Sequence, residues 1–195
     1  MFPEKEIDTF ARKALEEEGN GAHTYDHTRR VFAIATAIGN AENANQRVLG
    51  AAALLHDIGR PQEEKTGESH SILSGKMSLK FLSEIGYSES EVREVILAIR
   101  THRFSEGLEP DSLEGKILSD ADKIDAIGAI GVFRAIAQAT VSGRGIAGFL
   151  THADEKLLKL KDMLYTKKAR EVAEEKHSLL ADYVEKLKKE FNEIQ

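Results

Sequence analysis

The sequence contains no cysteine, so the protein can form no disulfide and can hold no metal through a thiolate. Any transition metal must therefore be bound by histidine and carboxylate side chains. Runs of about 20 apolar residues, which membrane spans need, are also missing, and the charged start MFPEKEIDTF lacks the apolar stretch of a signal peptide. These absences predict a cytoplasmic protein that does not associate with membranes.

Basic residues are not in excess: the sequence has 27 Lys and Arg and 33 Asp and Glu, which gives a formal net charge of −6. Binding to the phosphate backbone of nucleic acids depends on clustered Lys and Arg, so this balance argues against a nonspecific nucleic-acid surface. A small anionic substrate would instead need a locally basic pocket.

Sustained alternation of Val, Ile and Thr is missing, and apolar residues recur at helical spacing. The pattern predicts an all-α fold, a single-domain helical bundle. We expect helices at residues 4–17, 24–38, 44–57, 69–85, 89–101, 113–121, 124–139, 152–164 and 166–191. Gly59 and Pro61 are expected to stop the third helix, and residues 60–68 and 141–150 to form loops.

The last predicted helix carries an apolar stripe, with Lys and Glu on the opposite face. We expect this stripe to dock on the core, although part of it could pair with a second copy of the chain in a homodimer. Earlier in the chain, Ser88 and Glu91 have the spacing of a capping box, and Gly86 is placed to end the preceding helix.

A helix that is apolar on every side, at residues 49–55, ends directly in His56 and Asp57. An ionised carboxylate at the end of a buried helix costs several kcal/mol unless it is paired, hydrogen-bonded or bound to a metal. The structural alternative is a salt bridge from Arg60 to Asp57, with His56 hydrogen-bonded to a backbone carbonyl.

Two further segments place polar groups against the predicted core. His27 lies on the core side of its helix, and His23, one turn earlier, is expected to cap that helix or to support the site. The segment 118–128 has three acids between apolar stretches, which indicates a cation. A calcium loop of the helix-loop-helix type would need other residues where Ile124 and Asp125 stand, so that interpretation fails.

These three segments together resemble the HD superfamily of metal-dependent phosphohydrolases, whose pattern is a His on one helix, an adjacent His-Asp at the end of the next, and a distant Asp. Further matching segments lie at residues 54–59, 98–102, 120–135 and 152–158. The chain looks closest to the small stand-alone bacterial and archaeal HD-domain hydrolases, some of which cleave nucleotide phosphoanhydrides. The resemblance implies one HD-type domain over residues 1–195, with a metal-site core at about 20–140 and C-terminal helices at 152–192 packing on it.

Carried over to this chain, the resemblance implies one divalent metal ion held by His27, His56, Asp57 and Asp122. Two imidazoles and two carboxylates suit Mn, which we prefer, and also Mg, Fe, Ni or Zn. Asp57 is also expected to be catalytic, together with His70 and His102, which start and end neighbouring predicted helices. Some HD proteins use histidines at comparable places for a second metal. We favour phosphate contact and general acid work instead, because no bridging acid beyond Asp57 is evident.

Four basic residues are candidates for binding the negative charge of a substrate: Lys123, Arg30, Arg144 and Lys156. Lys123 is preferred because it adjoins a predicted ligand, and Arg144 lies in a Gly-rich segment. His152 either approaches the pocket, as the resemblance implies, or has an ordinary role at the start of a helix.

The expected function is hydrolysis of a phosphoester or phosphoanhydride bond in a nucleotide or similar small phosphorylated compound. A bound divalent ion acidifies water and polarises a phosphoryl oxygen, which suits this reaction. Two alternatives remain: a nonenzymatic metal-containing helical binding module, and an oxygenase with two irons, as known in the wider superfamily.

Overall fold

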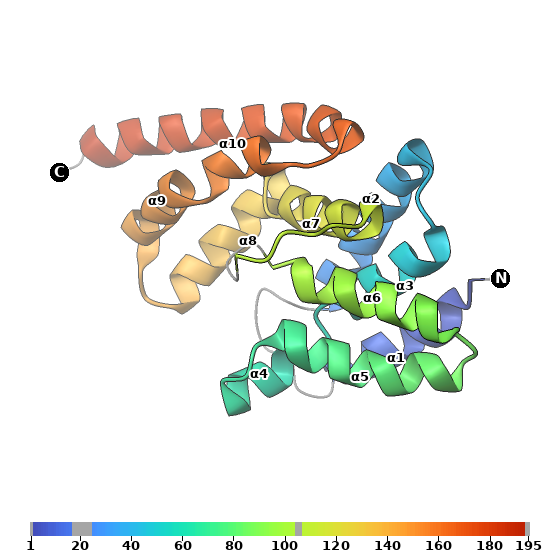
Figure 1. The fold of residues 1–195 in the computed structure, drawn as a ribbon. Helices are drawn as coiled ribbons and strands as arrows, with labels where there is room; N and C mark the ends of the chain where they lie inside the picture. Colours follow the sequence, from blue (N-terminus) through green and yellow to red (C-terminus); the bar gives the residue numbers. More distant parts are fainter. Residues whose placement is uncertain (1, 17–24, 104–106, 194–195) are drawn as a thin grey trace. The chain divides into compact units, whose positions relative to one another are not determined.

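The computed structural model describes residues 2–16, 25–103 and 107–193, and within these ranges the regular elements are all helices (Figure 1). The predicted all-α fold is confirmed. The helices are α1 (Glu4–Glu16), α2 (Tyr25–Glu42), α3 (Gln46–Leu55), α4 (Arg60–Thr66), α5 (His70–Glu84), α6 (Glu89–Thr101), α7 (Leu113–Asp125), α8 (Gly128–Val141), α9 (Gly145–Glu155), the 3₁₀ helix η2 (Leu157–Met163) and α10 (Lys167–Glu193). The predicted helix ends at Glu17 and Thr24, and His23, lie outside the described residues.

The chain divides into two compact units, Met1–Asp122 and Lys123–Gln195. In the first unit, α3 packs against α1, α2 and α6, and α5 packs against α4 and α6. Residues 48–55 of α3 are all buried, as the apolar run predicts. His56 and Asp57 follow α3 directly and are buried as well. Polar groups that are buried in this way need partners within the protein or a bound ion.

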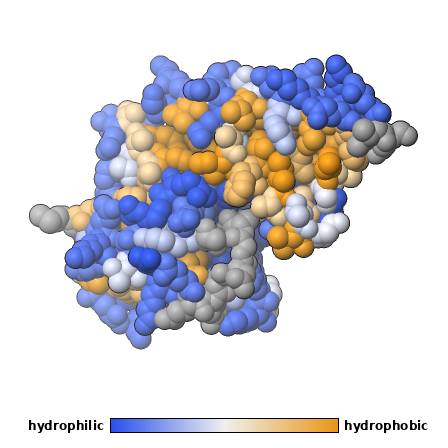
Figure 2. All heavy atoms as spheres, turned by 180° about the vertical axis from the view of Figure 1, so that it is seen from behind, coloured by the Kyte–Doolittle hydropathy of each residue, from blue (hydrophilic) through white to orange (hydrophobic). Residues whose placement is uncertain are grey.

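The second unit is built by α8, α9, η2 and α10, in which α8 packs on α9 and α10, and η2 packs on the same two helices. The apolar stripe of α10 is buried only in part: Ala169, Ala173, Leu180 and Val184 are buried, whereas Leu179 and Tyr183 are exposed. The space-filling view also shows apolar surface gathered on this unit (Figure 2). The exposed apolar residues of the unit include Ile130, Phe133, Val141 and Ile146. The homodimer remains a prediction.

The predicted loop at residues 60–68 is wrong, because residues 60–66 form α4. Pro61 does not stop the preceding helix but lies in the first turn of the next one, where a backbone N–H has no intrahelical partner and proline is favoured. Gly67, with a φ of 72°, ends α4 in the left-handed conformation. The catalytic candidate His70 therefore follows a helix instead of a long loop.

The break predicted between residues 121 and 124 is also misplaced, because α7 continues to Asp125 and the turn is made at Gly128, whose φ is 73°. The predicted loop at 141–150 is shorter than expected, since α9 begins at Gly145, and the predicted helix at 152–164 is split between α9 and η2. Within the described ranges no single helix is long and apolar enough to cross a membrane, whereas the bent pair of α7 and α8 meets that test by length and composition alone.

The start of α6 confirms the capping box. The Ser88 hydroxyl accepts a hydrogen bond from the Glu91 backbone N–H at 3.3 Å, and the Glu91 carboxylate accepts one from the Ser88 N–H at 2.8 Å. Gly86, with a φ of 80°, ends α5, as its position predicts. These caps fix the helix whose far end carries His102.

Candidate metal centre

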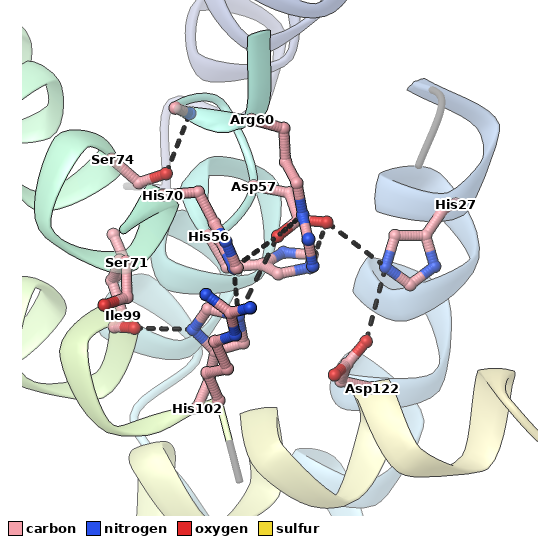
Figure 3. Close-up of polar contacts among 12 residues, drawn as sticks. His27, His56, Asp57, Arg60, His70, Ser71, Ser74, Ile99, His102 and Asp122 are labelled. Carbon is pink, nitrogen blue, oxygen red and sulfur yellow. Dashed lines mark hydrogen bonds and ion pairs between the residues drawn. The ribbon is translucent and has the colours of Figure 1, made fainter. Parts of the chain in front are cut away.

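Side chains from α2, α5 and α7, and residues directly after α3 and α6, converge in the first unit (Figure 3). They are His27 of α2, His56 and Asp57 after α3, His70 at the first position of α5, His102 after α6, and Asp122 of α7. The Asp122 side chain is 33% exposed, and the other five are at most 2% exposed. The structure thus brings together all six residues that the sequence singled out as ligands or catalytic groups.

A first group of donor atoms surrounds one oxygen of Asp57. His27 Nε2 lies 3.6 Å from Asp57 Oδ2 and 3.3 Å from Asp122 Oδ1. His56 Nε2 lies 3.7 Å from the same Asp57 Oδ2. Atoms that each bind one ion at about 2.0–2.2 Å lie roughly 3–4 Å apart, so these separations suit a shared divalent ion.

A second group surrounds the other oxygen of the same carboxylate. Asp57 Oδ1 lies 3.2 Å from His70 Nε2 and 3.8 Å from His102 Nε2, and the two Nε2 atoms are 3.4 Å apart. His27, His56 and Asp57, and separately Asp57, His70 and His102, form clusters able to hold a metal ion. Asp57 is the member common to both groups.

In three of the histidines, the contacts of Nδ1 determine whether Nε2, which faces the centre, carries a hydrogen. His56 Nδ1 lies 2.8 Å from the Ala53 carbonyl, and His102 Nδ1 contacts the Ile99 carbonyl. A carbonyl only accepts, so both Nδ1 atoms must carry a hydrogen. His70 Nδ1 likewise lies 2.9 Å from a carboxylate oxygen of Glu63. A neutral imidazole has one N–H, so each of the three Nε2 atoms presents a lone pair to the centre.

This arrangement leaves acceptors facing acceptors. With both imidazoles neutral, the Nε2 atoms of His70 and His102 lie 3.4 Å apart and beside the Asp57 carboxylate, and none of these three acceptors carries a hydrogen. His56 Nε2 is buried and makes no hydrogen bond to any described residue. Such a set of lone pairs and negative charge is unfavourable in a buried site unless a cation lies among them. The donor atoms therefore fit divalent metal binding.

Burial favours the neutral form of two of these histidines. It lowers the pKa of His56 to about 3 and that of His70 to about 4, although the charge of Asp57 acts in the opposite direction. Desolvation raises the pKa of the Asp122 carboxyl, but the contact with His27 outweighs it and the net pKa is well below its ordinary value. At neutral pH His56 and His70 are thus neutral and Asp122 is ionised, which are the states that metal binding requires.

The structural alternative is present in the same site. Arg60 Nε lies 3.0 Å from Asp57 Oδ1, and His56 does bond to a backbone carbonyl. These contacts engage only one side of each residue, because His56 Nε2 and Asp57 Oδ2 both point to the first group. The salt bridge and the carbonyl contact are therefore compatible with a metal ion at the first group.

Sequence reasoning missed Glu63 and Arg103. Glu63 Oε2 accepts from His70 Nδ1, and Glu63 Oε1 lies 2.8 Å from Arg103 Nη1 and accepts from the His70 backbone N–H at 3.2 Å. Burial raises the pKa of Glu63, but the His70 contacts and Arg103 outweigh it and leave that pKa lowered. Recognition of α4 as a helix would have placed Glu63 one turn after Arg60 and so next to the site. From the sequence, a loop is predicted at these residues instead.

The predicted substrate-binding residues belong to different units. Arg30 is half-buried in α2. Lys123, Arg144 and Lys156 belong to the second unit: Lys123 is buried with its Nζ 5.0 Å from the ring centroid of Tyr165, Arg144 donates to the Ser142 hydroxyl at 2.9 Å, and Lys156 is exposed. Their role in substrate binding remains a prediction.

His152, on α9, is half-buried, and burial followed by the charge of Lys156 lowers its pKa. Because His152 lies in the last turn of α9, the predicted role at the start of a helix is wrong. Its approach to the pocket stays a prediction.

Gly59 allows α5 to start close to His56 and Asp57. The substitution Gly59→Ala is therefore expected to disrupt the second donor group, which includes His70 of α5. An added Cβ would lie 2.6 Å from Leu73 Cβ and 2.8 Å from the His70 carbonyl oxygen, contacts that require backbone movement. We expect a loss of about 1–3 kcal/mol in the free energy of unfolding and a reduced Mn content, measured by urea denaturation and elemental analysis. Gly75→Ala in α5 is the control, because the added Cβ would lie no closer than 3.4 Å to any neighbouring atom. Equal behaviour of the two variants would contradict this account.

Acidification is expected to destabilise the metal-free protein between about pH 6.5 and pH 4. The pKa values of His56 and His70 are about 3 and 4 in the folded protein and 6.5 ordinarily, so within this window the unfolded chain binds more protons. The free energy of unfolding should therefore fall as the pH falls, by about 1.4 kcal/mol per pH unit for each histidine. Urea denaturation of chelator-treated protein at pH 7, 6 and 5 measures this slope, and His70→Gln should reduce it. A slope that His70→Gln leaves unchanged would contradict the prediction.

Known proteins share both the sequence and the fold. A family model described as HD domain matches residues 24–127. YpgQ of Bacillus subtilis is 35% identical over 194 residues, which cover 95% of this chain and 92% of YpgQ. The crystal structure of YpgQ in complex with ADP has a TM-score of 0.79 at 32% identity and covers 96% of this chain and 97% of that one.

Two further crystal structures are of proteins described as a predicted HD superfamily hydrolase and as an HD-superfamily hydrolase. The protein from an uncultured Thermotogales bacterium has a TM-score of 0.73 at 33% identity, covering 96% of this chain and 92% of its own. The Bacillus thuringiensis protein has a TM-score of 0.78 at 31% identity, covering 97% and 96%. A family match across more than half of the chain, with relatives aligned over nearly their whole length, shows that this chain belongs to the HD-domain family.

Proposed function

We propose that the protein is a metal-dependent phosphohydrolase that cleaves a phosphoester or phosphoanhydride bond of a nucleotide. The observation that carries the proposal is the pair of donor groups that share Asp57, each made of inward lone pairs and negative charge. The family includes proteins described as hydrolases, and the related YpgQ was crystallised with ADP. A nucleotide is therefore the substrate class to test first.

In this proposal His27, His56, Asp57 and Asp122 hold one divalent ion, with Mn preferred, and Asp57, His70 and His102 hold a second. A bound divalent ion supplies Lewis-acid polarisation of the phosphoryl oxygen and acidification of the attacking water. Asp57 contributes one carboxylate oxygen to each group, and Arg60 holds that carboxylate in place. This fixes the separation of the two groups independently of the substrate.

His70 and His102 act as ligands in this proposal and not as general acids. Each has its N–H on Nδ1 committed to an outward partner, and the Nε2 that faces the centre has no proton to give. The low pKa of His70 keeps it neutral at pH 7. Cleavage of a phosphoanhydride releases a weakly basic phosphate, which leaves without protonation, so the reaction does not require an acid at these positions.

A substrate screen tests the proposal. The purified protein is stripped with a chelator, reloaded separately with Mn, Mg, Fe, Ni or Zn, and incubated with nucleoside mono-, di- and triphosphates and cyclic dinucleotides. Release of phosphate or pyrophosphate is the expected result, and absence of turnover with every metal would contradict it. Oxygen consumption by the iron-loaded protein, without release of phosphate, would favour the oxygenase alternative.

A further inference from the structure

Two guanidinium groups converge on Glu63 at the edge of the second donor group. Arg103 Nη1 lies 2.8 Å from Glu63 Oε1, and Arg60 Nη1 lies 3.6 Å from Glu63 Oε2. Glu63 Oε2 also accepts from His70, and Arg60 Nε lies 3.0 Å from Asp57. Arg60 is thus joined to the second group through the carboxylates of Asp57 and Glu63, and Arg103 through that of Glu63. We refer to Arg60 and Arg103 as the arginine pair.

The arginine pair reaches solvent while the neighbouring ligands do not. The side chains of Arg60, Glu63 and Arg103 are 23%, 23% and 33% exposed, whereas those of Asp57 and His70 are at most 2% exposed. A guanidinium carries five N–H donors in a planar fork that matches phosphate oxygens, and the Arg60 contacts described above use only Nε and Nη1. Carboxylates that hold such groups in place preorganise them for an anion.

The local charge balance depends on metal. The two donor groups and Glu63 together carry three carboxylates, those of Asp57, Asp122 and Glu63, and with the two guanidinium groups of the arginine pair the formal charges sum to −1. One divalent ion changes this sum to +1, and two ions change it to +3. Metal loading therefore converts a site that repels anions into one that attracts them. A nucleoside diphosphate carries a phosphate beyond the one that is cleaved, and this second phosphate needs donors other than the ions.

We propose that Arg60 and Arg103, held by Glu63, form a subsite for a substrate phosphate next to the one that is cleaved. The inference rests on the proposed function in taking a nucleotide phosphate as the ligand, and it assigns residues that the sequence pattern did not. The competing explanation is that the arginines only neutralise Glu63 and Asp57 and stabilise the fold.

Binding of a nonhydrolysable nucleotide separates these explanations. The probe is α,β-methylene-ADP, titrated calorimetrically into Mn-loaded protein, so that affinity is measured whether or not the protein is a hydrolase. Arg103→Gln is expected to weaken binding about tenfold or more, at unchanged Mn content, because it removes a charge-assisted contact to phosphate. Arg103→Lys should show a smaller loss, since it keeps the charge but not the fork.

The control is Arg93→Gln, since Arg93 is 68% exposed and pairs only loosely with Glu89, at 3.8 Å. Its affinity for the probe should equal that of the wild type. A lower melting temperature for Arg103→Gln with unchanged affinity would overturn the proposal and support the structural explanation. If Arg103→Gln does not fold, Arg60→Gln is tested in its place, with Mn content measured because Arg60 contacts Asp57.

The two proposals fail in different ways. Turnover in the substrate screen with a KM that Arg103→Gln leaves unchanged would overturn the subsite and leave the hydrolase intact. Probe binding that depends on Arg103, without turnover of any nucleotide, would support the subsite and contradict the hydrolase.

Discussion

Asp57→Asn is expected to abolish turnover and to lower the affinity for Mn by more than about 100-fold. Asparagine keeps the shape of the side chain but removes the negative charge that lies between His27 and His56 on one side and His70 and His102 on the other. Because the same carboxylate serves both groups, neither can bind an ion normally. Loss of even about 3 kcal/mol of transition-state stabilisation lowers the rate by roughly 100-fold, and ion loss removes more than that.

Mn content by elemental analysis and turnover on the best substrate of the screen measure this prediction. Asp154→Asn is the control, because Asp154 is an exposed carboxylate whose described partner is Lys188, at 2.6 Å. Far-ultraviolet circular dichroism checks that the Asp57 variant is still helical. A folded Asp57→Asn protein with wild-type Mn content would show that the ions are held elsewhere.

The convergence of the proposed ligands could be predicted from the sequence because these polar residues lie in or beside apolar segments. The run at residues 49–55 is apolar on every side, and a charged residue directly after a buried helix needs a partner. The same argument singled out the acids around Asp122 and the core-facing His27. Their order along the chain then supplied the family pattern, and the structure brings them within a few ångströms.

Glu63 and Arg103 could not be predicted in the same way. They are 40 residues apart, and each is a charged residue of the kind that normally lies in solvent. Their contact depends on where α4 starts, and Pro61 was interpreted as the end of a helix although it belongs to the start of one. A proline favours the first turn of a helix as much as it disfavours the interior, and the sequence did not separate the two.

The choice of Lys123 as a substrate-binding residue rests on proximity along the chain and stays a prediction. Lys123 was preferred because it adjoins Asp122, but both lie in α7, where each residue is turned by about 100° from the one before it. The Asp122 carboxylate contacts His27, whereas Lys123 Nζ lies over the ring of Tyr165. Two basic residues distant from Lys123 in sequence, Arg60 and Arg103, lie beside the second donor group.

His102→Gln is expected to remove one metal ion and to leave the other. The substitution deletes an Nε2 of the second group, whereas His27, His56 and Asp57 of the first group remain. Mn content should fall from two ions per chain to one, and turnover should drop at least about 100-fold if the second ion stabilises charge in the transition state. His177→Gln is the control, because His177 lies on α10, in the other unit.

The stoichiometry decides between the two roles that the sequence left open for these histidines. Two ions in the wild type and one in His102→Gln would establish His102 as a ligand. One ion in both proteins, together with lost turnover, would instead support contact with the substrate phosphate. The structure favours the first outcome, because the lone pairs of His70 and His102 face each other at 3.4 Å and share the charge of Asp57. A phosphate, which is itself an anion and an acceptor, would add repulsion at that point, whereas a divalent cation among these atoms would remove it.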